Sequence, residues 1–269
     1  AAGGDIFFNP STAGNITVTG GPGDGLLNAA NTVSFRGGTV AVNVNQINGR
    51  VVSNGATIST AGVTTAQGDL NIGPFTSSGA TSFTASGAGA DIVVGGTLTN
   101  GTGGLTLQAG SGLDSDVRFN AGASSTGTLT INSGTGAGSE IILANSQLVQ
   151  GATVNANSAG FTLGTSAGLR ANTGALSLQS NGAGGALNIS AGSGALLRSV
   201  TSSVNLNGTT AGAITMVGGT GALQAGGASP AVNFNGGSNA VDVNIASIAG
   251  NASGTGSTYS VVTQTGNLN

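Results

Sequence analysis

Residues 104–110 read Gly-Leu-Thr-Leu-Gln-Ala-Gly, and residues 128–134 read Thr-Leu-Thr-Ile-Asn-Ser-Gly. In both segments apolar and polar residues alternate, and small residues flank the alternation. Successive side chains of a β-strand point to opposite faces, so the alternation predicts a short strand with one buried face. Similar segments begin at Leu176, Leu187 and Val232. No stretch shows a sustained helical spacing of apolar residues, and the sequence therefore predicts essentially no helix.

The predicted strands recur at short, nearly regular intervals. Leu105, Val117, Leu129 and Ile141 are each 12 residues apart, and the later starts are 8–11 residues apart. Such spacing fits a sandwich, a barrel or a stack of repeats. The likeness among the segments favours stacked repeats, and two or three modest apolar residues per strand suit a narrow core. We expect an all-β, right-handed parallel β-helix of about ten coils, each of roughly 20–30 residues.

The composition narrows the class of protein. Gly accounts for 52 of 269 residues, and charged residues make up 5%, against roughly 25% in an ordinary soluble domain. Glycines do not occupy every third position, which excludes collagen, and a net charge of -3 is low for a disordered chain. No apolar run approaches the ~20 residues that span a bilayer. The five basic residues are scattered, which predicts no nucleic-acid binding; they are Arg36, Arg50, Arg118, Arg170 and Arg198.

The chain is predicted to be a single solenoid over residues 1–269. Residues 1–90 are less regular and hold three of the four prolines, which predicts longer loops or a cap. Residues 91–269 are predicted to form regular coils. Gly and Asn recur where corners would need a positive φ angle. Stacked Asn side chains can form hydrogen-bonded ladders, and the candidates are Asn132, Asn188, Asn207 and Asn235.

Residues that could carry catalysis are scarce. The sequence contains neither His nor Cys, which removes Ser-His and Cys-His nucleophiles and the usual zinc sites. We predict no enzyme activity and no cofactor. The densest charged cluster is Asp-Ser-Asp-Val-Arg at residues 114–118. Asp114 and Asp116 are weak candidates for calcium ligands, but calcium takes six to eight oxygens, so a solvated corner with a local Asp–Arg pair is favoured.

The residues that two further functions of β-solenoids require are scarce or irregularly placed in this sequence. Polysaccharide-cleaving β-helices need clustered carboxylates, basic residues and aromatic subsites, whereas this chain has one Tyr, no Trp and no Lys. Ice-binding solenoids need Thr-x-Thr segments at one strict period. Such segments occur at residues 17–19, 97–99 and 128–130, but they do not recur at one period. Neither function is favoured by the sequence.

Three segments resemble the repeats of filamentous haemagglutinin-type and autotransporter adhesins of Gram-negative bacteria. They are Gly-Asn-Ile-Thr-Val at 14–18, Gly-Asp-Leu-Asn-Ile at 68–72 and Gly-Thr-Leu-Thr-Ile-Asn at 127–132. The resemblance implies a right-handed β-helix that is exported and works at the bacterial cell surface in adhesion, biofilm or fibre formation. It leads us to expect a secreted protein, located on that surface.

These observations together favour a structural role. The leading hypothesis is the shaft of an adhesin or the subunit of a self-assembling surface fibre, joined end to end through its terminal coils. Phe7 and Phe8 at one end and Val261 and Val262 at the other are the candidate assembly residues, with the first core layer as the alternative role for the two phenylalanines. The sequence stops within a Gly-Asn-Leu-Asn repeat, which predicts continuation into another segment or subunit. The alternatives are a monomeric segment that binds a host surface or glycan and, third, a polysaccharide-degrading enzyme.

Overall fold

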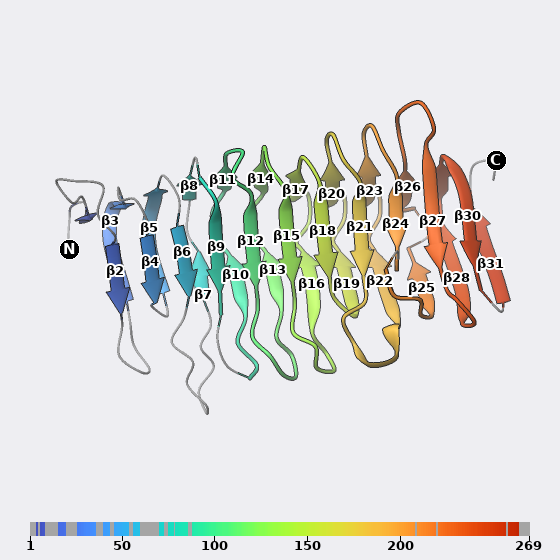
Figure 1. The fold of residues 1–269 in the computed structure, drawn as a ribbon, viewed down its shortest axis with the longest axis horizontal. Helices are drawn as coiled ribbons and strands as arrows, with labels where there is room; N and C mark the ends of the chain where they lie inside the picture. The colour runs from blue at the N-terminus through green and yellow to red at the C-terminus, as the bar shows by residue number, and fades with distance from the viewer. Residues whose placement is uncertain are drawn as a thin grey trace.

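The computed structural model describes residues 88–207, 209–218, 220–256 and 258–263, and before them Gly4 and the segments 6–8, 16–19, 26–35, 40–43, 46–53, 56–59, 70–72, 75–77 and 79–85. These residues form a long rod of stacked coils, with the first and the last described strands at opposite ends of the rod (Figure 1). All strand pairs are parallel within this part of the chain. The predicted all-β parallel solenoid is confirmed.

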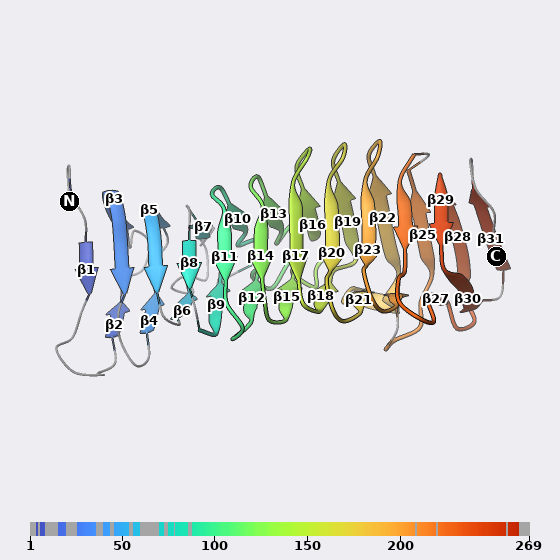
Figure 2. The ribbon, with the colours of Figure 1, turned by 90° about the horizontal axis from the view of Figure 1, so that it is seen from above.

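Each regular coil contributes one strand to each of three faces. Face 1 comprises β7 (Leu70–Ile72), β10 (Ile92–Val94), β13 (Val117–Phe119), β16 (Glu140–Leu143), β19 (Gly160–Leu163), β22 (Leu187–Ala191), β25 (Ile214–Val217), β28 (Ala240–Ile245) and β31 (Thr258–Thr263). Face 2 comprises β1 (Ile6–Phe8), β8 (Phe75–Ser77), β11 (Leu98–Asn100), β14 (Ala123–Ser125), β17 (Leu148–Gly151), β20 (Gly168–Ala171), β23 (Leu196–Ser199), β26 (Ala222–Gln224) and β29 (Ser247–Ala249). Figure 2 shows the face 2 strands from β8 to β23 in one row.

Face 3 is a sheet of eleven described strands. They are β2 (Ile16–Thr19), β4 (Val40–Asn43), β6 (Ala56–Ser59), β9 (Thr81–Thr84), β12 (Leu105–Gln108), β15 (Leu129–Asn132), β18 (Val154–Asn157), β21 (Leu176–Gln179), β24 (Val204–Leu206), β27 (Ala231–Asn235) and β30 (Asn251–Thr255). Two longer strands, β3 (Leu26–Phe35) and β5 (Gln46–Ser53), run through both face 1 and face 2 and join them into one sheet.

The coils differ in length but keep their register. Strands β10 to β30 make seven consecutive coils of three strands each. The sequence predicted about ten coils. This is close to the eleven described strands of face 3, but higher than the seven coils between β10 and β30. Asn233 lies 28 residues after its ladder neighbour Asn205, whereas Ser253 follows Asn233 by 20 residues. Loops at the corners absorb this variation, because the paired strands stay aligned.

The predicted strand positions agree with the structure. Strands β12, β13 and β15 begin at Leu105, Val117 and Leu129, as expected, and β16 begins one residue before Ile141. Apart from one 3₁₀ turn, η1 (Ala183–Gly185), the described residues contain no helix. None of them lies in a helix long and apolar enough to cross a membrane. The prediction of longer loops or a cap in residues 1–90 falls largely on connections outside the described residues.

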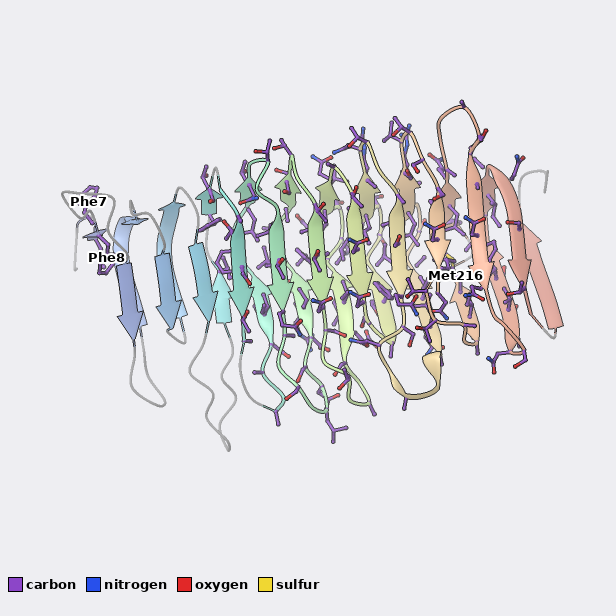
Figure 3. The ribbon with its side chains drawn as sticks, in the orientation of Figure 1. Phe7, Phe8 and Met216 are labelled. Carbon is purple, nitrogen blue, oxygen red and sulfur yellow. The ribbon has the colours of Figure 1, made fainter. Side chains whose placement is uncertain are left out.

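The core is a narrow apolar column inside the three faces. In β12, Leu105 and Leu107 are buried while Thr106 and Gln108 face outward, and the same alternation recurs along the rod. Phe75 and Phe83 meet edge to face with ring centroids 4.9 Å apart. Met216 of β25 is also inside (Figure 3). Inward Leu, Ile, Val and Phe thus stabilise the stack by burying apolar area, at roughly 25 cal/mol per Å².

The corners need small residues because successive coils lie close together. A Cβ added to Gly127 would overlap the carbonyl oxygen of Thr102 in the preceding coil. Asn207 has a φ of 55° and is fully buried. Its side-chain amide donates to the carbonyl oxygen of Gly185 at 2.9 Å, and its side-chain oxygen accepts the amide hydrogen of Ser180 at 2.9 Å. This corner asparagine is therefore satisfied by backbone groups.

Candidate functional site

The outward surface of face 3 is polar and uncharged. None of its eleven described strands contains a charged residue. A groove of about 940 Å³ runs over β15, β18, β21, β24, β27 and β30. We call it the amide groove. One column of paired residues lines it, one from each of these strands: Thr130, Asn155, Ser177, Asn205, Asn233 and Ser253.

Many amides of this surface bond to one another along the rod. Asn132 donates to the side-chain oxygen of Gln108 at 2.9 Å, and Asn157 donates to that of Asn132 at 2.6 Å. Asn233 donates to Asn205 at 2.8 Å, and Ser253 donates to Asn233 at 2.9 Å. These two amide ladders cross several coils, and each bond contributes roughly 0.5–1.5 kcal/mol net.

The ladder prediction was partly right. Asn132 belongs to a ladder, and Asn235 accepts a hydrogen bond from Thr255 at 3.2 Å on the next coil. Asn207 is a corner residue bound mainly to backbone groups, and its side-chain oxygen also accepts a hydrogen bond from the side-chain amide of Gln179 on the preceding coil at 3.4 Å. The prediction was wrong for Asn188, which is exposed on face 1 and forms no side-chain hydrogen bond with the described residues. Sequence analysis missed Asn157, Asn205 and Asn233, because their partners are set by the register of coils of unequal length.

One asparagine of the groove has a side chain without a hydrogen-bond partner among the described residues. Asn155 lies between Thr130 and Ser177 in the column, and its side chain has no hydrogen-bond partner among the described residues. At the side of the groove, Gln179 holds the loop that contains Thr209. The side-chain oxygen of Gln179 accepts one hydrogen bond from the Thr209 backbone amide at 2.9 Å and another from the Thr209 hydroxyl at 2.7 Å. The groove thus combines a rigid frame with free donor and acceptor groups at Asn155.

Face 1 carries a different arrangement, which we call the acidic column. Asp91, Asp116 and Glu140 follow one another on successive coils. The side chain of Asp91 accepts the amide hydrogen of Asp116 at 2.8 Å, and Asp116 accepts that of Glu140 at 2.7 Å. Arg118 pairs with Asp116 at 2.5 Å and with Asp91 at 3.4 Å. The carboxylates of Asp91 and Asp116 therefore bind backbone amides and one guanidinium, and Glu140 accepts the hydroxyl hydrogen of Thr162 at 2.8 Å. These contacts give all three acids a structural explanation.

Burial raises the pKa of Asp116 above its ordinary value, because its charged form loses solvation. The hydrogen bond from the Glu140 amide and the charge of Arg118 lower this pKa, and the charges of Asp91 and Glu140 raise it further. The net shift is upward. Asp116 is therefore a carboxylate whose ionised form is less favourable in the folded chain than in the unfolded chain.

The structure separates the two predicted calcium candidates. Asp114 lies at an exposed corner with a φ of 51°, while Asp116 is buried in the ion pair with Arg118. No group of three or more acidic side chains among the described residues is arranged to hold a metal ion. The local Asp–Arg pair expected from residues 114–118 is present, and it extends to Asp91 on the preceding coil.

Two of the scattered arginines meet on face 2. Arg170 of β20 pairs in register with Arg198 of β23, and Gln150 and Gln224 occupy the same position on the neighbouring coils. Neither arginine forms an ion pair with the described residues, and Nε of Arg170 is buried without a hydrogen-bond partner there. Face 2 therefore carries a small positive charge, face 1 carries the described acids except Asp114, which lies at a corner, and face 3 is neutral.

The predicted assembly residues lie at the two ends of the rod. Phe8 packs partly against the core, whereas Phe7 is 65% exposed (Figure 3). Val261 and Val262 lie in β31, whose backbone pairs with β28, in register with Val243 and Asn244. Phe8 thus fits the core alternative and Phe7 does not. The assembly role itself stays a prediction for all four residues.

No protein-family model, no curated protein sequence and no solved structure matches this chain.

Proposed function

We propose that this chain is a non-enzymatic structural rod on the outside of a bacterial cell, as the shaft of an adhesin or the subunit of a surface fibre. The observation that carries the proposal is the unbroken stack of coils. Eleven strands pair in parallel in face 3, and buried apolar residues continue from Ile72 to Ile248. A stack of this kind spreads a force along the rod over many backbone hydrogen bonds.

One end of the rod supports fibre formation. Among the described strands, β31 pairs with β28 alone. A strand edge of this kind is a template for further parallel pairing. The low charge of the chain also gives little repulsion between two copies. A second copy, or further coils of the same shaft, would extend the register at the edge of β31.

Negative-stain electron microscopy of the purified chain over rising concentration tests the fibre. We expect rods that join end to end into filaments of constant width. Rods that stay single at high concentration would contradict the fibre and leave an isolated shaft.

Antibody labelling of intact cells that produce the native protein tests its location. Labelling without permeabilisation is expected, and labelling that requires permeabilisation would contradict the surface role.

A further inference from the structure

We infer that the amide groove of face 3 is a binding site for an uncharged polysaccharide lying along the rod. This goes beyond the structural role proposed above and does not depend on it. The inference rests on the groove's shape, the chemistry of its column and the free side chain of Asn155.

The dimensions of the groove suit one extended polymer chain. Its column crosses six strands, and at ~4.8 Å per strand the groove is about 24 Å long. Its volume is about 940 Å³, and it is open to solvent on its outer side. Thr209 of the loop held by Gln179 borders the groove.

The chemistry of the column suits hydroxyl groups. Its members are hydroxyls and amides, which both donate and accept hydrogen bonds. The described charged residues lie on the other two faces or at a corner, so the groove offers no ion pair to an acidic polymer. The surrounding ladders hold Asn157, Asn205 and Asn233 in fixed positions. A sugar chain would therefore meet a preorganised surface, and Asn155 would supply its free amide.

Two other occupants fit less well. An extended peptide adds to a sheet through a backbone edge, but the groove presents side chains, since each of β18, β21, β24 and β27 is paired on both sides. A second copy of this rod would present a broad sheet face, which does not fill a narrow groove. Phe234 lines the groove but is 1% exposed, so aromatic stacking on sugar rings is not available there. Binding through hydrogen bonds alone is weak for a short sugar, and the test therefore uses long polymers.

Affinity electrophoresis of the full chain in native gels tests the inference. The probes are three uncharged polymers (hydroxyethylcellulose, dextran and a galactomannan) and the acidic polymer alginate. We expect at least one uncharged polymer to retard the chain, and alginate to retard it less. Asn155→Ala should weaken the retardation at least three-fold. Asn244→Ala is the matched control, because Asn244 is an exposed strand asparagine of face 1, and it should behave as the wild type.

A second variant, Ser177→Phe, fills the middle of the groove from an outward position and should abolish the retardation while the strand signal in circular dichroism is unchanged. Several results would overturn the inference. They are no retardation by any uncharged polymer, stronger retardation by alginate, and equal retardation of the wild type and both groove variants. A wild-type dimer in analytical ultracentrifugation that Ser177→Phe disrupts would also overturn it, because the groove would then be a contact between copies.

Discussion

Face 1 and face 3 are built from the same alternating strands around the same core, but their outer surfaces differ. Ile141 of face 1 and Ile131 of face 3 are both fully buried. Outside, face 1 carries the acidic column with Arg118, whereas the strands of face 3 carry only uncharged residues. The comparison indicates that inward residues determine the stacking of coils. Outward residues are then free to give each face its own chemistry.

The largest expected effect comes from inward positions, and it should be the same on both faces. Ile131→Ala and Ile141→Ala each leave a cavity in a closed core and should lower the free energy of unfolding by about 2–5 kcal/mol. Their outward neighbours Thr130→Ala and Ile142→Ala are the controls and should cost less than ~1 kcal/mol. Denaturant unfolding measures all four. A face that tolerates alanine at its inward position would break the comparison.

Corner glycines should give the next largest effect. Gly127→Ala, at the corner before β15 of face 3, forces a methyl group against the preceding coil and should cost about 1–3 kcal/mol. Gly95→Ala is the control, because its nearest neighbour is 3.7 Å away and the position is exposed. Its thermal midpoint should equal or exceed that of the wild type. Equal midpoints for both variants would show that the coils are less tightly stacked than described.

The amide ladder should give a smaller effect that is specific to face 3. Asn132→Ala removes the hydrogen bonds to Gln108 and from Asn157, and should cost about 1–2 kcal/mol. Asn188→Ala, at an exposed position of face 1 without such bonds, should change the free energy of unfolding by less than ~0.5 kcal/mol. Equal losses for the two variants in urea unfolding would mean that the ladder contributes nothing beyond strand propensity.

The smallest effect is the pH response of face 1. Because the pKa of Asp116 is raised in the folded chain, the folded state binds its proton more readily than the unfolded state. Ionised Asp116 therefore lowers the free energy of unfolding. This loss is absent below the ordinary carboxyl pKa of about 3.9 and grows as the pH rises through the raised pKa of the folded chain. The stability of the wild type relative to Asp116→Asn should fall over this range, as thermal midpoints from pH 3 to pH 7 can show.

Replacing the arginine sharpens this prediction. Arg118 lowers the pKa of Asp116, so Arg118→Met should raise it and shift the fall in stability to higher pH. Thermal midpoints of Arg118→Met with and without Asp116→Asn, measured from pH 3 to pH 7, give the shift in the pH at which stability falls. A wild-type stability that instead rises with pH relative to Asp116→Asn would contradict the raised pKa.

Much of the fold could be predicted from the alternation alone. Segments such as residues 105–108 and 129–132 contain the whole inward and outward pattern of a strand, and both are strands. The lateral partners could not be predicted, because they depend on coil lengths that vary from 16 to 28 residues in the described strands. Asp116 meets Asp91, 25 residues earlier, and not its sequence neighbour Asp114. The amide groove likewise exists only once the register has aligned its six strands.

The direction of the strands relative to the rod is the central claim, and diffraction from aligned rods tests it most directly. Parallel coils place strands across the rod, so the ~4.8 Å spacing between strands should appear along the rod's long axis. The same spacing should appear in power spectra of cryo-electron microscopy images of single rods. A 4.8 Å reflection perpendicular to the long axis would contradict the account, because the strands would then run along the rod.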